Sequence, residues 1–437
     1  MLSPTPSGVP SRNLPPSCSH ESAGCQNDPM SSAVPVHELD LPQLDMDSNP
    51  DPAARARLIA EAREKHWLAR GLFGYTVTAY DDVLAVLRDK RWYSAASLAV
   101  ELSGVSDPAF HQNRRQSILA MEGDDHTRLR RLVAPAFSPR AADRLRPYMR
   151  DVINGLVDEV AASGRCEFVT DVCEPYPIPI ICELLGAPKE DWRLFSRWAG
   201  DLLKIFNFNL GEDYKLVMQA SRELDAYSST MIEQRRTKPA DDLLTALIAA
   251  EESGDRLTHD ELLSMVNAVI VGGTDTTRNQ LACCVALLAS HPDQWRLLAD
   301  QPELAPRAVE ETMRYLGAVR GTARFASEDI EYRGVLFPKG TFIAAVTAAA
   351  NRDPVHWDDP QRFDITREPS GQPNLTLGAG IHYCLGASLA RAELQEALPI
   401  LARRMPDLTL DGEIVWKPNG VAIWGPERLP ISFTPAS

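Results

Sequence analysis

Leu377-Gly378-Ala379-Gly380-Ile381-His382-Tyr383-Cys384-Leu385-Gly386 is the stretch of this chain that says most about its fold. Glycines let a backbone adopt positive φ angles and approach a flat ligand closely. Leu385, Leu389 and Ala392 follow at helical spacing, so a helix is predicted to begin directly after Cys384. The unpaired N–H groups and positive dipole end of a helix start favour thiolate over thiol. The stretch therefore predicts a glycine-rich loop that presents a thiolate. A buried free cysteine beside a helix cap is the alternative.

This stretch resembles the haem-binding loop of the cytochrome P-450 superfamily, whose pattern is Phe-Gly-x-Gly-x-His-x-Cys-x-Gly. Every fixed position matches except the first, where Leu377 replaces phenylalanine. Leucine keeps an apolar shield near the sulfur but loses the ring, so the iron potential and the hydrogen bonding of the sulfur could differ modestly. The resemblance implies that Cys384 is the axial ligand of haem b (iron protoporphyrin IX) and that His382 contacts a haem propionate.

The composition limits the classes of partner. The chain has 437 residues, 44% of them hydrophobic, with a net charge of −15 and a pI of about 5.1. This charge argues against nucleic acid or an anionic membrane as the main partner. The eight cysteines form no CxxC pair and no zinc spacing, which predicts a reducing, cytoplasmic compartment. No apolar run reaches the roughly eighteen residues that a membrane span requires.

The chain is expected to contain one large domain. Its first thirty residues are rich in Ser, Pro and Asn and show no hydrophobic signal core, so residues 1–49 are predicted to form a disordered or extended tail. Met30 is a possible natural start. Residues 50–437 show no repeat and no long linker, and they are predicted to form one domain.

Helical patterns dominate from about residue 125 to 316, after a helix over Pro52–Gly71 and a strand over Tyr75–Thr78. Short β segments follow, at Ile330–Tyr332 and Thr341–Val346, and then an irregular meander from Asn351 to Thr376. Many helices with a few small sheets indicate a mainly α (α+β) architecture.

The longest predicted helix runs from Thr258 to about Ser290, or about 50 Å at 1.5 Å per residue. Thr258 and Glu261 form a capping box at its start, and Pro292 follows its end. Its centre, residues 271–277, contains two glycines and three threonines, which all weaken a helix interior. This predicts a local distortion of the helix there. A close helix–helix crossing that needs small residues is the alternative.

Within that centre, Gly272-Gly273-x-Asp275-Thr276-Thr277 resembles the oxygen-activating segment of the same superfamily. The resemblance implies that Asp275 and Thr276 form an acid–alcohol pair above the iron. Cleaving bound dioxygen requires two protons in a site that otherwise excludes water. A hydroxyl can hold the reacting oxygen by hydrogen bonding, and a carboxylate can relay protons from solvent.

Cationic groups matching the propionate-binding positions of the superfamily occur in three places. His126 and Arg130 stand one helical turn apart, and Arg324 falls on a short strand after the helix that carries Glu311. His382 is the fourth group. Arg128 and Arg131 lie on the outer side of the His126 helix, where they could dock an acidic electron donor or form a solvated face.

Glu311 and Arg314 stand three residues apart on one predicted helix, a spacing too common on protein surfaces to be informative alone. With Arg362 in Pro360-Gln361-Arg362-Phe363 they match the structural Glu/Arg/Arg triad of the superfamily. The resemblance gives these residues a folding role, locking the meander behind the cysteine loop. It spans roughly Trp92 to Phe433, with at least five motifs in family order.

The substrate pocket is predicted from the loop 95–119, the helices around 202–216 and the exposed side of the longest helix, including Asn267. Most of its expected lining is apolar, which suits terpenoids, steroids, fatty acids or polyketides alike. Arg320, four residues before Arg324, either points outward or meets a substrate carboxylate, since an unpaired buried guanidinium is costly. The single residues predicted to line the pocket are Ala268, Val271, Gly272, Val319, Arg320, Ile423 and Trp424.

The resemblance implies a cytochrome P-450 fold, with a helix-rich lobe and a smaller β-rich lobe around a buried haem. It implies a soluble monooxygenase that inserts one oxygen atom from O₂ into an apolar small molecule. No flavin- or nicotinamide-binding pattern occurs, so electrons are expected from a separate ferredoxin and ferredoxin reductase. The alternatives are a haem-thiolate peroxygenase or dehydratase, and a haem sensor or ligand carrier without turnover. The intact Asp275-Thr276 pair argues against both.

Overall fold

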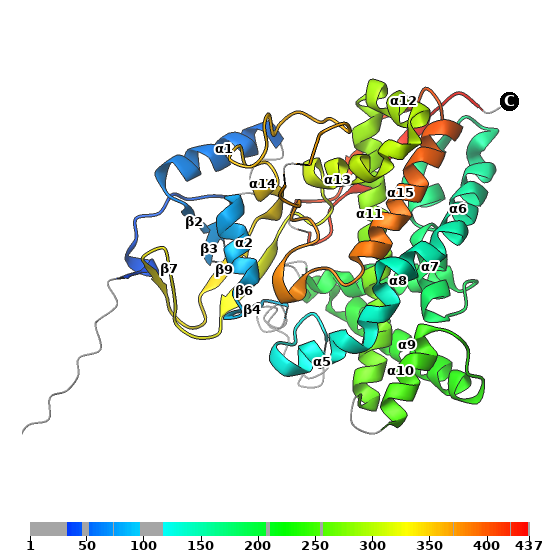
Figure 1. The fold of residues 1–437 in the computed structure, drawn as a ribbon, viewed down its shortest axis with the longest axis horizontal. Helices are drawn as coiled ribbons and strands as arrows, with labels where there is room; N and C mark the ends of the chain where they lie inside the picture. Colours follow the sequence, from blue (N-terminus) through cyan, green and yellow to red (C-terminus); the bar gives the residue numbers. More distant parts are fainter. Residues whose placement is uncertain are drawn as a thin grey trace, which may run out of the picture.

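A computed structural model describes residues 33–45, 52–72, 74–96, 117–206, 210–253, 257–369, 371–419 and 421–435. Most helices lie on one side of the molecule, and the largest sheet lies on the other with α1 and α2 (Figure 1). The predicted helix-rich lobe and smaller β-rich lobe are confirmed. None of the helices in these ranges is long and apolar enough to cross a membrane.

The helices form where apolar residues recur at helical spacing, and their packed faces build one large core. The helical segments are α1 Pro52–Lys65, α2 Tyr80–Arg88, α5 Gly123–Val133, α6 Pro139–Ala161, α7 Pro177–Leu185, α8 Trp192–Leu203, α9 Leu210–Thr237, α10 Leu243–Glu252, α11 His259–Ala289, α12 Pro292–Asp300, α13 Ala305–Tyr315, α14 Thr347–Ala350 and α15 Ala387–Arg404, with the short η1 Val36–Glu38, η2 Ala134–Phe137, η3 Val169–Cys173, η4 Lys204–Phe206, η5 Pro302–Leu304 and η6 Gly380–His382.

The strands form four small sheets rather than one large one. The largest has the order β2-β3-β9-β6-β4, and it brings Arg324 on β6 opposite Ser94 on β4. The others have the orders β1-β8-β7, β10-β13-β5 and β11-β12. The strands are β1 Val34–Pro35, β2 Leu68–Gly71, β3 Gly74–Val77, β4 Trp92–Ser94, β5 Arg165–Glu167, β6 Thr322–Ala326, β7 Ile330–Tyr332, β8 Val335–Phe337, β9 Phe342–Ala345, β10 Thr409–Leu410, β11 Val415–Trp416, β12 Pro426–Arg428 and β13 Pro430–Ser432.

The central helix α11 forms as the sequence predicted. The Thr258 hydroxyl accepts from the Glu261 N–H, and the Glu261 carboxylate accepts from the Thr258 N–H, which completes the capping box. The predicted local distortion does not interrupt the helix, which stays continuous through residues 271–277. Instead, Thr274 and Thr276 each donate a hydroxyl hydrogen bond to the carbonyl four residues earlier, at Ile270 and Gly272.

Two boundaries near the N-terminus differ from the prediction. The helix predicted over Pro52–Gly71 ends at Lys65, and residues 68–71 form β2, because Leu68 and Ala69 are buried at the end of the largest sheet. Residues 33–45, assigned to the tail from sequence, pack on the folded body. Val34 pairs with Val335 on β8, and Val36 and Leu44 are buried. The folded part therefore includes residues 33–45.

Candidate functional site

The Cys384 loop leaves η6 and leads directly into α15, so the cysteine stands at a helix start as predicted. The Cys384 N–H donates to the Leu377 carbonyl at 2.9 Å, which closes the loop on itself. Gly380 has a φ of +70°, and a Cβ atom there would collide with the Leu87 carbonyl of α2. Only glycine therefore allows this close packing of the loop against α2. Cys384 itself is partly exposed.

The predicted lowering of the Cys384 pKa does not hold for the protein alone. Burial raises the pKa of the thiol above its usual value. The N–H of Gly386 and the charges of Arg130 and Arg391 act in the opposite direction, but they are the smaller effects. The loop therefore supplies the groups that stabilise a thiolate, and full ionisation requires a further positive charge at the sulfur.

One face of α11 is open along the middle of this largely buried helix. Ala268, Val271 and Thr276 are partly exposed and Gly272 is exposed, and the spacing of these residues places them on one side. A Cβ atom at Gly272 would meet nothing within 4 Å, so open space adjoins the helix there. The Thr276 hydroxyl donates to the Gly272 carbonyl at 2.8 Å on this face.

The predicted propionate-binding residues partly come together. The rings of His126 and His382 lie 4.5 Å apart, and the His382 Nε2 lies 2.9 Å from the Glu122 carboxylate. Arg324 is buried, its pKa is lowered by burial, and the charge of Glu122 acts against that lowering. Arg130 contacts the same loop differently, by donating to the Tyr383 carbonyl at 2.6 Å.

Two buried polar atoms in this cluster lack a partner among the described residues. They are the Nε2 atom of His126 and the Oε2 atom of Glu122. Burial, with the charges of His382 and Arg130, lowers the pKa of His126 to about 4, so its ring is neutral near pH 7. An unsatisfied buried polar atom is costly and usually marks an absent ligand or water. The ring nitrogens of His126 and His382 and the guanidinium of Arg324 can donate to the acidic side chains of a haem, whereas Glu122 Oε2 is an acceptor.

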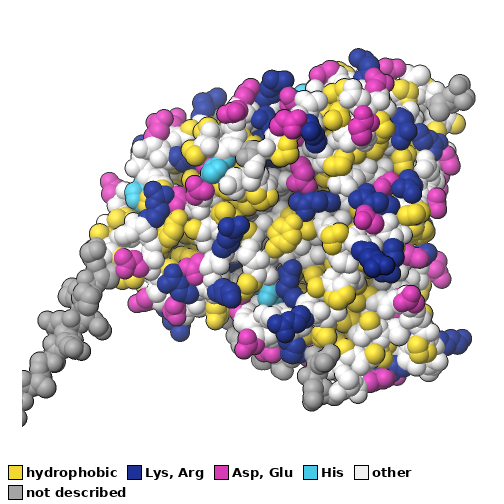
Figure 2. All heavy atoms as spheres, viewed as in Figure 1, with side chains coloured by type: hydrophobic (Ala, Val, Ile, Leu, Met, Phe, Trp, Pro, Cys, Tyr) yellow, Lys and Arg dark blue, Asp and Glu magenta, His cyan; other side chains and the backbone are white. Residues whose placement is uncertain are grey.

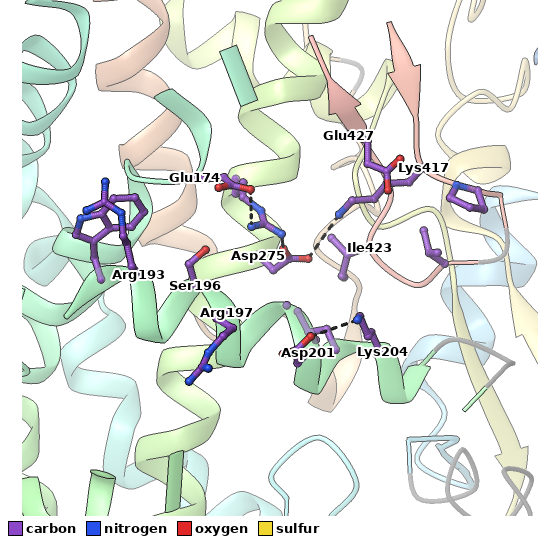
Figure 3. A pocket seen from close by; sticks show the side chains of 16 residues that line it. Glu174, Arg193, Ser196, Arg197, Asp201, Lys204, Asp275, Lys417, Ile423 and Glu427 are labelled. Atoms are coloured by element: carbon purple, nitrogen blue, oxygen red, sulfur yellow. Dashed lines mark hydrogen bonds and ion pairs between the residues drawn. The ribbon is translucent and has the colours of Figure 1, made fainter. Parts of the chain in front are cut away.

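Asp275 lines a cavity of about 600 Å³ with many charged side chains, which come from α8, α11 and residues 417–418 and 421–427 (Figure 3). Its carboxylate pairs with Arg278, which lies 3.4 Å from Glu174, and its other oxygen lies 4.0 Å from the Lys417 ammonium. Burial lowers the pKa of Lys417, and the charge of Asp275 acts against that lowering. The cavity therefore connects a buried carboxylate to a chain of charged side chains.

A second buried carboxyl lies close to the same helix. Glu393 on α15 is fully buried, and burial raises its pKa to about 8, although a hydrogen bond from Thr277 acts in the opposite direction. Its Oε1 atom has no partner in the part of the chain that the structure describes. Glu393 is therefore a neutral acid near pH 7, next to the segment that contains Asp275 and Thr276.

The sequence did not identify Glu122, Lys417 or Glu393 as site residues. Glu122 had a usable signal, because it stands one helical turn before His126. Lys417 and Glu393 had none, since each reaches α11 from an element far away in the chain.

The structural triad contains Arg367 and not the predicted Arg362. Glu311 is buried and accepts two hydrogen bonds from Arg314, at 2.7 and 2.8 Å. Arg367 donates to the same carboxylate at 3.3 Å, whereas the Arg362 side chain is 66% exposed and pairs with Asp364. Arg362 takes part through its carbonyl, which accepts from both Arg314 and Arg367. The side chain of Arg362 itself faces solvent.

The predicted pocket residues divide between several environments. Ala268, Val271 and Gly272 lie on the open face of α11, and Val319 is partly exposed. Ile423 lines the Asp275 cavity, whereas Trp424 and Arg320 line a different cavity. Asn267 was wrongly assigned to the pocket, because its amide is bonded to Asp225 and Ser228 on α9.

Much of the predicted pocket loop, residues 97–116, lies outside the described residues, as do residues 207–209. The predicted docking residue Arg128 pairs with Glu261 and Asp125, so it ties α5 to the start of α11. Arg131 is exposed.

The model of one protein family, described as cytochrome P450, matches residues 182–405. The mycinamicin IV hydroxylase/epoxidase of Micromonospora griseorubida is 38% identical, over 82% of this chain and 89% of that relative. The 6-deoxyerythronolide B hydroxylase of Saccharopolyspora erythraea is 36% identical, over 83% of this chain and 90% of that relative.

Solved structures show the same fold. The crystal structure of CalO2 matches with a TM-score of 0.82 and 32% identity, covering 89% of this chain and 97% of the other. P450BioI in complex with an acyl carrier protein ligated to hexadec-9Z-enoic acid matches with a TM-score of 0.79 and 33% identity. That match covers 86% of this chain and 98% of the other.

Proposed function

The chain belongs to the cytochrome P450 family and is a monooxygenase of that family. We propose how its own residues perform the reaction. The protein inserts one oxygen atom from O₂ into a large apolar organic molecule. The observation that carries this proposal is the position of Thr276 and Asp275 on α11, between the open face of the helix and the polar cavity.

The haem is proposed to be haem b, held by Cys384 as the axial thiolate. When bound, it supplies the iron at which O₂ is activated. Cys384 would bind the iron as a thiolate, because coordination to a metal ion favours the loss of the thiol proton against the burial that raises the pKa of Cys384. His126, His382 and Arg324 are proposed to bind the propionates, because they gather donors around a buried spot with unsatisfied polar atoms. Arg130 is proposed to assist from the loop side, where it already contacts Tyr383.

Asp275 and Thr276 are proposed to deliver protons to the reacting oxygen. The Asp275 carboxylate faces the polar cavity, where Arg278 and Lys417 hold it by charge. The neighbouring Thr276 hydroxyl lies on the open face and can exchange its bond to the Gly272 carbonyl for a bond to a ligand there. A proton taken up by Asp275 from the cavity can thus reach the open face through the hydroxyl.

The substrate is proposed to be large and apolar. The open face of α11 presents Ala268 and Val271, and such apolar walls bind apolar groups. The names of relatives support this size class, since they refer to mycinamicin IV, 6-deoxyerythronolide B and a 16-carbon acyl chain.

Electrons are proposed to come from a separate ferredoxin, which in turn receives them from a ferredoxin reductase. Tyr383, beside Cys384, is 40% exposed, so this loop reaches the surface. Lys and Arg side chains gather in the middle of the face shown in Figure 2, over the loop before α15 and over α5. On a chain with a net charge of −15, such a local basic area attracts an acidic partner.

The test is substrate-dependent O₂ uptake in the presence of a ferredoxin, its reductase and NADPH. Candidate substrates are first selected from a compound library by their shift of the Soret band. Oxygenated product in proportion to O₂ consumed supports the proposal. Product formed only when hydrogen peroxide replaces O₂ and the electron donors, or binding without any product, would refute it.

A further inference from the structure

Glu122 directly precedes α5, and its side chain is only 9% exposed. One carboxylate oxygen, Oε1, accepts from the Ser94 N–H at 2.6 Å and lies 2.9 Å from the His382 Nε2 atom. A carboxylate can only accept hydrogen bonds, so the His382 Nε2 atom carries the hydrogen of this contact. Glu122 therefore joins the start of α5 to β4 and to the Cys384 loop, and it orients the His382 ring.

The other carboxylate oxygen of Glu122, Oε2, is buried and has no hydrogen-bond partner in the described part of the chain. A second such atom, the Nε2 of His126, belongs to the same group of residues, because the His126 ring lies 4.5 Å from that of His382. Buried polar atoms without a partner are rare in folded proteins, and those of charged groups are the most costly. The free oxygen of Glu122 therefore indicates a role in the site rather than in the fold alone.

The charge of Glu122 acts on the proposed propionate-binding residues. Burial lowers the pKa of Arg324, and the charge of Glu122 acts against that lowering. Burial, with the charges of His382 and Arg130, lowers the pKa of His126 to about 4, and the charge of Glu122 again acts in the opposite direction. Glu122 is thus close enough to both elements, α5 and β6, to interact with whatever their side chains bind.

The balance of fixed charges in this site is unusual for a site that binds an acidic group. The positive charges of Arg130 and Arg324 equal the negative charges of two propionates, and the Glu122 carboxylate is a further negative charge in the same place. Reduction of a ferric haem adds one more negative charge. A buried carboxylate nearby opposes that addition, because it is screened far less than a carboxylate in solvent.

We propose that Glu122 is a positioning residue that lowers the reduction potential of the bound haem. Its Oε1 atom fixes Ser94 and His382, and its Oε2 atom brings uncompensated negative charge to the propionate site. The donor that passes one electron to the ferric iron must then itself have a low potential, as many iron–sulfur proteins do. This inference rests on the proposed haem site, and it concerns the reduction potential alone.

The test is the reduction potential of the haem in the wild type and in Glu122→Gln, from spectroscopic titration of the holoproteins with dithionite and redox mediators, without substrate or O₂. Glutamine keeps a side-chain acceptor for Ser94 and His382 but removes the charge. Removing one buried charge is expected to raise the ratio of ferrous to ferric protein about tenfold at a fixed potential, or about 59 mV. Haem transfer to apomyoglobin, measured alongside, is expected not to become faster.

Asp124→Asn is the matched control, because Asp124 lies in the first turn of α5, is exposed and loses the same charge. It is expected to leave the potential unchanged. Glu122→Asp shortens the side chain but keeps the charge, so its potential is expected to stay close to that of the wild type. If Glu122→Gln does not fold, Glu122→Ser removes the same charge, and the same rise is expected.

An unchanged or lower potential without the Glu122 charge, or an equal rise in Asp124→Asn or Glu122→Asp, would overturn the proposal. Loss of haem from the uncharged variants but not from Glu122→Asp would overturn it too, since the charge would then serve to hold the haem. Because neither substrate nor O₂ is present, a raised potential in an enzyme that oxygenates nothing would contradict only the monooxygenase function.

Discussion

Replacing Arg367 and Arg362 separately by alanine tests which arginine completes the structural triad. Arg367 is 17% exposed, and it contacts the buried Glu311 carboxylate at 3.3 Å. It also donates to the carbonyls of Asp358, Asp359 and Arg362, at 2.7, 3.1 and 2.8 Å. The Arg362 side chain is 66% exposed, and its charged partner is Asp364 at 3.1 Å.

The two alanine variants are expected to lose clearly different amounts of free energy of unfolding. Removing one partner of a buried pair costs about 3–5 kcal/mol. Arg314 remains bonded to Glu311 and Arg367 is partly solvated, so about 3 kcal/mol is expected for Arg367→Ala. An exposed pair contributes about 0–1 kcal/mol, which sets the loss for Arg362→Ala. An unfolding entropy of about 2.1 cal/mol/K per residue gives roughly 0.9 kcal/mol/K for 437 residues. The unfolding temperature should therefore fall by about 3–4 °C in Arg367→Ala and by at most about 1 °C in Arg362→Ala.

The assay is thermal unfolding of both holoproteins by far-ultraviolet circular dichroism at one scan rate, with the retained haem measured alongside. Arg367→Ala should also lose haem at a lower temperature, because the meander that it fastens precedes the Cys384 loop. A larger fall for Arg362→Ala than for Arg367→Ala would refute this reading of the triad.

Three further predictions concern the proposed site. Cys384→Ala should abolish the long-wavelength absorption of the reduced carbon monoxide complex. Replacing Cys283, a buried cysteine on α11, by alanine should leave this absorption intact. Loss of the absorption in both variants would contradict the assignment of Cys384 as the axial ligand. Thr276→Ala should bind haem and substrate but release most of its electrons as hydrogen peroxide, so product formed per NADPH should fall several-fold. Unchanged coupling would leave Thr276 a packing residue. Glu393 has a pKa of about 8 in the folded protein and about 4.5 unfolded, so the folded state binds more protons between these values. Its contribution to stability is present below about pH 4.5 and is lost as the pH rises to 8, at up to about 1.4 kcal/mol per pH unit. Glu393→Gln should flatten this part of the pH dependence in urea unfolding, and an unchanged slope would contradict the raised pKa.

Local sequence signals predicted the parts of the site that depend on neighbours in the chain. The α11 capping box formed as expected, because Thr258 and Glu261 need only each other. The glycine at position 380 allows the loop to pack on α2, and the glycines at positions 378, 380 and 386 are enough to predict a loop there. That His126 and His382 lie together, by contrast, was expected only from the resemblance to the superfamily, which assigns both residues to the haem propionates.

Contacts between distant segments were less predictable. Arg362 and Arg367 both lie within the meander, and the sequence does not say which of the two side chains turns inward. In the structure the Arg367 side chain reaches Glu311, and the Arg362 side chain pairs with Asp364 in solvent. The pKa of Cys384 was predicted too low because the sequence shows the helix start but not the burial that opposes it.

Residues 417–419 and 421–424 make several of the contacts that the sequence did not predict. Lys417 lies beside Asp275, Asn419 accepts from Arg55 and Arg320, Ile423 faces the Asp275 cavity and Trp424 supports Arg320. One short stretch of chain thus contributes a charged neighbour to Asp275 through Lys417 and an aromatic support to Arg320 through Trp424. Neither contact could be predicted from the sequence, because each joins this stretch to an element far away in the chain, and the stretch carries no recognisable motif of its own.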